Sequence, residues 1–208
     1  MSILVALSTK FPGCRDLLFQ NKHVIAAWRG ARQVERKVYL RVLEFKDLQK
    51  THLWMNEPEL SELMGCMPFN AHQQEKWFDT TIDNRTKFIF AICKTVDDEH
   101  IGNIGLNPVD FINSNAMLSI FIADKKERSQ GMGFEAIKLA LKFSFHRLNM
   151  HKVFLKTSDH LAAAITFYKR VGFVEEGLLR EHEFKGGKFI NKMLLSILRS
   201  EFDERYEK

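Results

Sequence analysis

Short apolar or alternating runs follow one another from residue 36 onward, separated by longer stretches of helical period. Alternation or a short apolar run predicts a strand, whereas apolar residues three and four apart predict an amphipathic helix. Strands are therefore predicted at residues 38–42, 87–94, 101–109, 117–122 and 153–157, and in two runs that flank a turn at 185–188. Helices are predicted at residues 45–54, 71–82, 131–148 and 162–170.

The connections between these elements indicate how the strands pair. Asp97-Asp98-Glu99 and Asn113-Ser114-Asn115 join the three strands between residues 87 and 122, and turns this short require an antiparallel meander. The predicted helix at 131–148 is a crossover, so the strands before and after it are expected to be parallel. Lys185-Gly186-Gly187-Lys188 predicts a closing hairpin. The expected fold class is mixed α/β (α+β), with about seven strands and helices on both faces of the sheet.

Residues 1–36 differ from this pattern and are expected to form an extension of unknown role, with a short helix possible at 16–32. The remaining residues, 37–208, are expected to form the main domain. Hydrophobic residues make up 45% of the 208-residue chain and charged residues 27%, which is typical of a globular protein.

Charge and cysteine content narrow the class of partner. The formal net charge is +5 and the Lys and Arg residues are scattered, which suits a small anion and does not favour nucleic acid. Cys14, Cys66 and Cys93 form neither a disulfide framework nor a zinc pattern. No apolar run approaches the roughly 20 residues of a membrane helix. A cytoplasmic protein without a membrane partner or a metal is expected.

A glycine-rich stretch, residues 127–134, precedes the helix predicted at 131–148. Glycine lets a ligand approach the main chain closely, and the N-terminal N–H groups of a helix bind anions. Gly131 and Gly133 could also serve only to cap the helix. Together with Ala136 they match the dinucleotide-binding fingerprint, but residues 124–130 separate them from the preceding strand, which belongs to a meander. The stretch is therefore interpreted as an anion site of another kind.

Several motifs in order resemble those of one family. Arg128-x-x-Gly131-x-Gly133 resembles the Arg/Gln-x-x-Gly-x-Gly/Ala signature of the GNAT N-acetyltransferases. The resemblance extends over residues 37–201, and its other motifs are Asn56-Glu57-Pro58-Glu59, Ala164-Ile165-x-x-Tyr168-Lys169-x-x-Gly172-Phe173 and Leu179-Arg180-Glu181. It is nearest to the branch of ribosomal-protein N-terminal, spermidine and amino-sugar acetyltransferases. The implied architecture is the GNAT fold, in which the parallel pair of strands is splayed.

The resemblance implies acetyl-CoA as the acetyl donor. Main-chain N–H groups of the glycine-rich stretch would hold its pyrophosphate, at Arg128, Ser129, Gln130, Gly131, Met132, Gly133 and Phe134. The pantetheine arm would pair with the backbone of Ile120, Phe121 and Ile122, and an N–H near Phe121 or Ile122 could stabilise the oxyanion. Leu161 stands where many relatives carry an Asn that contacts the pantetheine; Ser158, Asp159 or His160 could replace that contact.

Acyl transfer to an amine requires an acid for the leaving thiolate and a base for the amine. Tyr168 corresponds to the acid of the family. Glu57 and Glu181 are the candidates for the base, with Glu59 and Glu183 as alternatives. Glu181 and Glu183 are expected on one face of a regular strand.

The expected function is transfer of an acetyl group from acetyl-CoA to a primary amine of an amino sugar, a polyamine or a protein N-terminus. A CoA-binding module without turnover and a ribosome- or RNA-associated protein are alternatives. Edge strands near the C-terminus allow a homodimer.

Overall fold

The computed structural model describes residues 36–128 and 130–207. Within these residues seven strands form one sheet in the order β1-β2-β3-β4-β5-β7-β6. The strands are β1 (Val38–Val42), β2 (Phe88–Lys94), β3 (His100–Asp110), β4 (Asn115–Ile122), β5 (Lys152–Ser158), β6 (Val174–Lys185) and β7 (Lys188–Leu198). Every neighbouring pair is antiparallel except β4 and β5, which are parallel as predicted.

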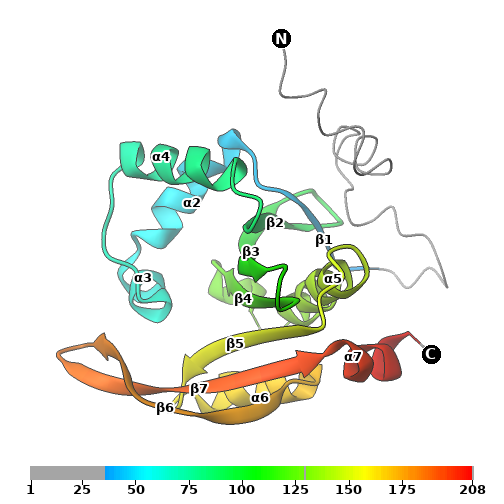
Figure 1. The fold of residues 1–208 in the computed structure, drawn as a ribbon. Coiled ribbons are helices and arrows are strands. Elements are labelled where there is room, and N and C mark those ends of the chain that lie inside the picture. Colours follow the sequence, from blue (N-terminus) through cyan, green and yellow to red (C-terminus); the bar gives the residue numbers. More distant parts are fainter. Residues whose placement is uncertain (1–35, 129, 208) are drawn as a thin grey trace.

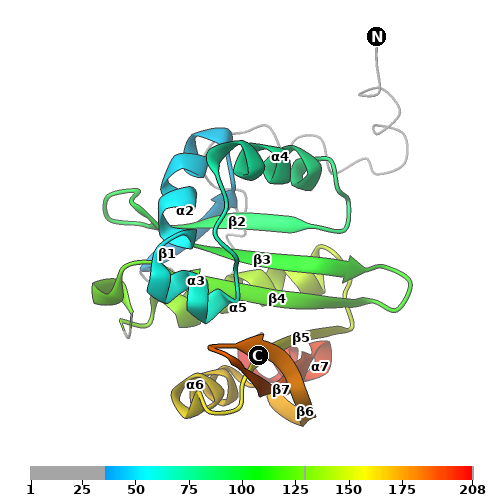
Figure 2. The same cartoon turned by 90° about the vertical axis from the view of Figure 1, so that its left-hand side faces the viewer.

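Helices cover both faces of the sheet. They are α2 (Leu48–Met55), α3 (Pro58–Met64), α4 (Ala71–Ile82), α5 (Met132–His146), α6 (Ala162–Val171) and α7 (Arg199–Tyr206), with short 3-10 helices η1 (Phe45–Asp47) and η2 (Lys125–Glu127). Figure 1 and Figure 2 show α2, α3 and α4 on one face of β2, β3 and β4, and α5 on the opposite face.

Burial on both faces explains the continuous apolar run of β2. Phe90 and Ile92 point into the main core, where α5 contributes Ile137, Leu141 and Phe145. The alternate residues Ala91 and Cys93 of β2 pack on the other side, in a smaller cluster. Its other members are Tyr39 of β1, Leu43 just after β1, Leu48 of α2 and Phe78 of α4. A strand with both faces covered needs apolar residues at successive positions.

β4 and β5 separate soon after they meet. They pair only at Asn115–Lys152, Ala116–Val153 and Met117–Phe154. β5 then continues along β7, and β4 along β3. A bulge in β3 lies between Leu106 and Val109, opposite Met117. Because a bulge bends a strand and increases its twist, it accounts for the divergence of the two strands at that residue.

The sequence predicted most of these elements and missed two helices. β1 and α4 have the predicted bounds, and the other predicted strands and helices differ from the observed ones by a few residues at their ends. α3 begins at Pro58, where the sequence pattern predicts no helix; proline disfavours helical geometry in the residue before it but suits the first position of a new helix. α7 is mostly polar and was not predicted. The helix expected at 16–32 lies outside the described residues.

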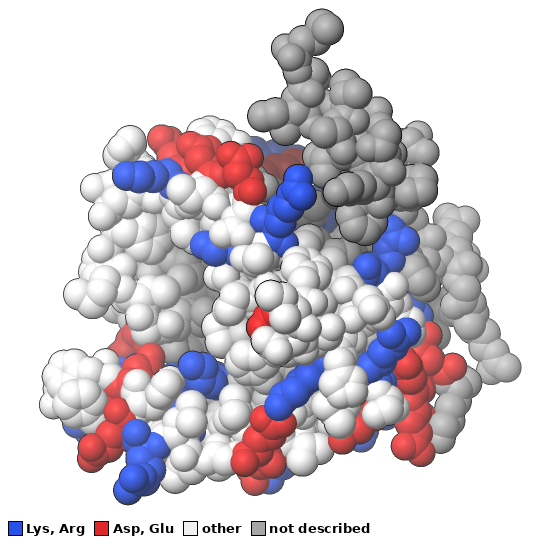
Figure 3. Space-filling model, in the orientation of Figure 1, with Lys and Arg blue, Asp and Glu red and all other residues white. Residues whose placement is uncertain are grey.

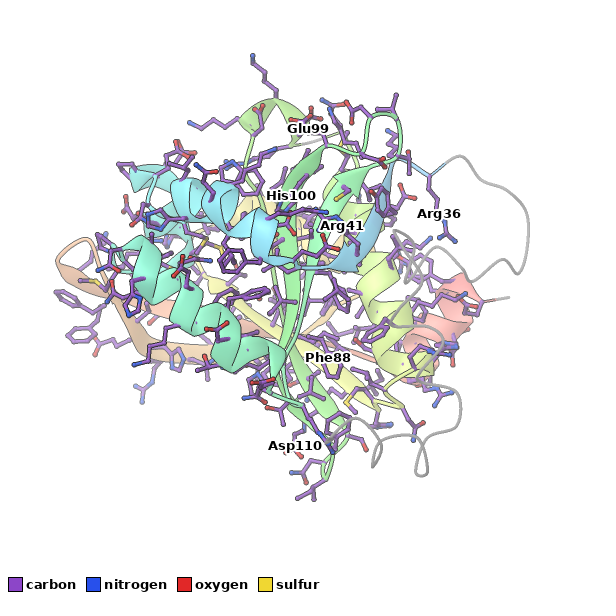
Figure 4. The ribbon with its side chains drawn as sticks, turned by 90° about the horizontal axis from the view of Figure 1, so that it is seen from above. Arg36, Arg41, Phe88, Glu99, His100 and Asp110 are labelled. Carbon is purple, nitrogen blue, oxygen red and sulfur yellow. The ribbon has the colours of Figure 1, made fainter. Side chains whose placement is uncertain are left out.

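A buried ion pair ties β1 to the start of α2. Arg41 donates two hydrogen bonds to Asp47, at 2.6 and 2.7 Å. His100 of β3 lies beside this pair, with its Nδ1 3.5 Å from Asp47 Oδ1, and Figure 4 shows Arg41 and His100 close to α2. Burial by itself would raise the pKa of Asp47, but hydrogen bonds from Arg41 and from the Glu44 N–H hold that pKa below its ordinary value.

Asp47→Asn is expected to lower the free energy of unfolding by about 3 kcal/mol near neutral pH, because it leaves the largely buried Arg41 without its counter-charge. The lowered pKa means that the contribution of Asp47 is complete above the unfolded-state pKa of about 3.9 and is lost as the pH falls through the native value. The difference between wild type and variant should therefore shrink below about pH 4. Urea unfolding at several pH values measures it.

Asp79→Asn, at an exposed position of α4, is the matched control and should change the unfolding free energy by less than about 0.5 kcal/mol. Equal unfolding free energies for Asp47→Asn and wild type at neutral pH would contradict a stabilising role for the pair.

Candidate active site

The gap between β4 and β5 exposes one edge of β4. Past Met117, β4 has no strand partner on its β5 side among the described residues. Ile120, Phe121 and Ile122 lie in this unpaired part, while their other edge pairs with β3. Backbone N–H and C=O groups on an open edge are available to an extended ligand. The structure therefore places the three residues predicted to contact pantetheine where a ligand can pair with them.

Arg128 holds the end of β4 in place. Its Nε donates to the carbonyl of Ile122 at 2.9 Å, and one terminal nitrogen donates to the carbonyl of Ala123 at 3.2 Å. Its other terminal nitrogen lies 3.4 Å from the carboxylate of Glu59 in α3. The Arg128 guanidinium is thus occupied by the protein itself, so its side chain positions the loop that leads to the glycines.

The N-terminus of α5 presents main-chain donors. Gly131 is the N-cap, and its φ of 84° lies in the left-handed region that favours glycine. The N–H groups of Met132, Gly133 and Phe134 have no acceptor inside the helix, because helical bonds run four residues back. No described side chain caps this end. Free N–H groups at the positive end of a helix dipole are suited to binding an anion.

The surroundings of Gly133 favour a role in anion binding over a role that is limited to capping the helix. A Cβ added at this position would meet only Phe167 Cζ of α6, at 3.7 Å, which is an ordinary contact. Packing within the protein therefore does not require glycine at 133, whereas the conformation of Gly131 does require it. The absence of a side chain at 133 leaves room for a ligand close to the helix end.

Lys37 is a neighbour of this loop that the sequence did not reveal. Its Nζ donates to the carbonyl of Gln130 at 2.8 Å, and its backbone N–H donates to Glu135 Oε2 at 2.9 Å. The side-chain amide of Gln130 donates in turn to the carbonyl of Lys126 at 2.5 Å. Lys37 precedes β1, some 93 positions from Gln130. Only the fold brings this cation to the glycine-rich stretch. Ser129 lies outside the described residues.

Tyr168 lies on α6, the helix that packs against the start of α5. Its neighbour Phe167 reaches Gly133, and the ring of Tyr168 packs against Phe167 and Phe173 at centroid distances of 5.4 and 5.9 Å. The side chain is partly buried, and this burial raises the pKa of the Tyr168 phenol to about 12. The hydroxyl is therefore protonated throughout the physiological range.

The predicted bases lie on different elements. Glu57 is exposed and is the N-cap of α3. Asn56, before it, fixes the α2–α3 turn by exchanging two 3.0 Å hydrogen bonds with the backbone of Phe69. Glu59 forms ion pairs with Lys125 and Arg128. Its pKa is lowered, first by the hydrogen bond from Lys125.

The strand face expected for Glu181 and Glu183 is interrupted. β6 changes register against β7 between Leu179 and Glu183, and Glu181 has a φ of 48°. The regular alternation expected here is therefore wrong, because the extra residues form a bulge. Glu181 is exposed, and its N–H donates to Asn191 Oδ1 at 2.9 Å. Glu183 forms an ion pair with Lys192.

Leu161 is the N-cap of α6 and makes no side-chain cap. Two of the three residues expected to replace the missing Asn are engaged elsewhere. Ser158 Oγ accepts from Lys192 at 3.3 Å, and Asp159 accepts from Asn191 at 2.9 Å. The third, His160, is exposed.

A cavity of about 460 Å³ lies beside the open part of β4. Its floor includes Ile120 and Phe121, and its walls come from α2, α3, α4 and the segment between α3 and α4. Its apolar lining includes Met55, Met64, Phe69 and Trp77. An acceptor molecule bound here would lie next to the backbone groups at the end of β4.

The described residues contain no group of three or more His, Cys, Asp or Glu side chains that could hold a metal ion. No helix among them has the length and apolar character needed to cross a membrane.

Comparison with known proteins identifies relatives of the chain. A family model described as an acetyltransferase (GNAT) domain matches residues 37–174. A spermidine N(1)-acetyltransferase of Vibrio cholerae is 30% identical over 171 residues, covering 81% of this chain and 96% of the relative.

Solved structures give the same picture. A spermidine N-acetyltransferase from Vibrio cholerae, in complex with CoA and spermine, superposes with a TM-score of 0.76 at 27% identity, covering 80% of this chain and 98% of the other. A dodecameric structure of the spermidine N-acetyltransferase from Vibrio cholerae has a TM-score of 0.72 at 27% identity, with coverages of 82% and 98%.

These matches confirm the predicted fold class and acetyl-CoA as the donor. They also confirm the predicted activity, acetyl-CoA-dependent transfer of an acetyl group to a primary amine. With a matching domain that spans well over half of its length, the chain belongs to the GNAT acetyltransferase family.

Proposed function

We propose that acetyl transfer occurs in the gap between β4 and β5, by direct attack of the amine on the thioester carbonyl. The observation that carries this proposal is the edge of β4 that no described strand covers, which leads into a helix N-terminus whose N–H groups no described side chain caps. An extended arm that ends in a diphosphate would match both features at once. An oxyanion formed at the thioester carbonyl would accept a hydrogen bond from an N–H near Phe121 or Ile122.

The diphosphate would be bound by the main chain. The N–H groups of Met132, Gly133 and Phe134 have no acceptor within the helix, and Gly131 shapes the turn before them. Lys37 adds a positive charge from the neighbouring β1 segment. Arg128 contributes by holding the carbonyls at the end of β4. The backbone N–H groups of Arg128, Ser129 and Gln130 remain predicted contacts.

Tyr168 would protonate the departing CoA thiolate. Its pKa of about 12 keeps the proton on the phenol at the pH values at which a thiolate forms. A thiol in water has a pKa of about 8.5, but burial raises the pKa of a thiol as it raises that of a phenol. Desolvation of the site therefore reduces the mismatch between the acid and the leaving group, and permits transfer of the proton.

Glu57 is the carboxylate we propose for removing the proton of the amine, through water. It heads α3, whose last residue Met64 lines the cavity. Glu181 remains a second candidate, on the bulge of β6. Glu59 and Glu183 are less suitable as bases, because both already form ion pairs.

The acceptor is a primary amine, and the relatives show one class that a GNAT site of this branch can use. The Vibrio cholerae relative is named for spermidine, and its structure contains spermine. We also propose that this chain assembles into an oligomer, because a dodecamer is described for that enzyme. The expected homodimer and the cytoplasmic location remain predictions.

Gly133→Ala is expected to raise the Kd for acetyl-CoA by about tenfold to a hundredfold, because the added methyl group would occupy space needed by the diphosphate. The melting temperature should not fall, since the methyl group meets only Phe167 at an ordinary distance and Ala is the better helix former. Calorimetric titration with acetyl-CoA measures the effect.

Gly177→Ala is the matched control, because a Cβ in that part of β6 would meet nothing within 4 Å. It should leave the Kd unchanged. Unchanged acetyl-CoA affinity in Gly133→Ala as well would remove this helix end from the binding site.

Tyr168→Phe is expected to lower kcat by about 10²-fold or more with a small change in KM, because the variant lacks the proton donor. In the wild type, the high pKa of Tyr168 should prevent any loss of kcat from its ionisation below about pH 11. Thiol release in the presence of a panel of amines measures both effects.

Tyr39→Phe removes a phenolic hydroxyl on β1, the edge strand of the sheet, where that group donates to Asp98 at 2.9 Å. Its kcat should equal that of the wild type. A Tyr168→Phe enzyme with full kcat would exclude Tyr168 as the acid, and binding of acetyl-CoA with no thiol release from any amine would mean a module without turnover.

A further inference from the structure

The cavity beside β4 carries no charge among the described residues that line it. None of them is Asp, Glu, Lys, Arg or His. The polar lining groups are neutral, and two of them bind each other: Asn103 Nδ2 donates to Thr51 Oγ1 at 3.3 Å. Asn103 Oδ1 also lies 2.7 Å from the ring of His100 behind the wall. The rest of the wall is largely apolar, with thioether and aromatic side chains such as Met55, Met64 and Trp77.

A polyamine does not suit such a wall. After one amine has lost its proton for attack, spermidine still carries ammonium groups, and burying a charge without a counter-charge is strongly unfavourable. Two acids on α3 and β6 are already engaged, and Glu57 is the base proposed for the one amine that reacts. Glu59 is paired with Lys125 and Arg128, and Glu183 with Lys192. Figure 3 shows charged side chains spread over the top, the right side and the lower half of the face in view.

The lining does suit an aromatic body. Methionine side chains adapt to the shape of a ligand and make favourable contacts with aromatic rings. Trp77, whose side chain is 37% exposed, offers a ring surface to the cavity. The volume of about 460 Å³ lies in the usual range for a small-molecule site. An amine at Ile120 and Phe121 would have its body extending toward α3 and α4.

We propose that the acceptor is a small primary monoamine that carries an aromatic ring, and that this chain discriminates against polyamines. This inference rests on the proposed function, because it assigns the cavity as the acceptor side of the acetyl-transfer site. The discriminating feature is the uncharged wall: it accepts one amine after deprotonation and offers no carboxylate to a second or third ammonium group.

The full chain, with saturating acetyl-CoA, is tested with 2-phenylethylamine and with spermidine by following thiol release. The expected kcat/KM is greater for 2-phenylethylamine by about tenfold or more. Equal or greater kcat/KM for spermidine overturns this inference and leaves the acetyl transfer itself intact. A preference of about tenfold for a peptide with an apolar first residue over 2-phenylethylamine also overturns it. Thiol release with none of the amines overturns the proposed function together with the inference.

A charge placed in the wall tests the cause of the selectivity. Met64→Glu should lower the ratio of kcat/KM for 2-phenylethylamine to that for spermidine by about tenfold or more, because it supplies the missing carboxylate. Leu63→Glu is the matched control, since Leu63 is on the same helix, is exposed and does not line the cavity. An unchanged ratio in Met64→Glu, or an equal shift in Leu63→Glu, contradicts the role of the wall.

Trp77→Ala provides a second readout that does not depend on an introduced charge. KM for 2-phenylethylamine should rise by about tenfold, while the Kd for acetyl-CoA stays at the wild-type value. An unchanged KM would show that the aromatic body does not lie against Trp77.

Discussion

β4 and β5 pair over three residues and then diverge, and the candidate site depends on that divergence. Each strand is held along its other edge by an antiparallel neighbour, and the bulge in β3 opposite Met117 bends the first half of the sheet away. If β4 and β5 had stayed paired, the backbone N–H and C=O groups of Ile120, Phe121 and Ile122 would have formed their hydrogen bonds within the sheet. Instead these groups face a gap in which an extended ligand can take the place of a strand.

Several elements around the gap contribute to the candidate site. Arg128 binds the last carbonyls of β4 and so directs the chain into the turn at Gly131. α5 then begins beside Phe167, the neighbour of Tyr168, with N–H groups that no side chain in the described part of the chain caps. The proposed donor site, the proposed acid and the proposed acceptor cavity all lie around this gap. The cavity differs from the rest of this region because its wall is uncharged, and that difference bears on which amine the enzyme uses.

The sequence correctly predicted the features that depend on residues close together in the chain. The alternation in β1, the meander turns and the helical period of α5 all have the expected outcome. Prediction failed where distant residues meet. The approach of Lys37 to Gln130, the bulge that turns Glu181 out of the regular strand and the uncharged cavity all depend on tertiary packing. The motif resemblance identified Tyr168 as the candidate acid, but only the structure shows that burial raises the pKa of its phenol.

Hydrogen–deuterium exchange with and without CoA tests most directly whether the open edge of β4 and the start of α5 form one binding site. CoA is expected to slow exchange at both segments, 118–122 and 131–134, whereas the amides of the β6–β7 hairpin turn should exchange as before. Slower exchange at neither segment, or only at surfaces away from the gap, would contradict it.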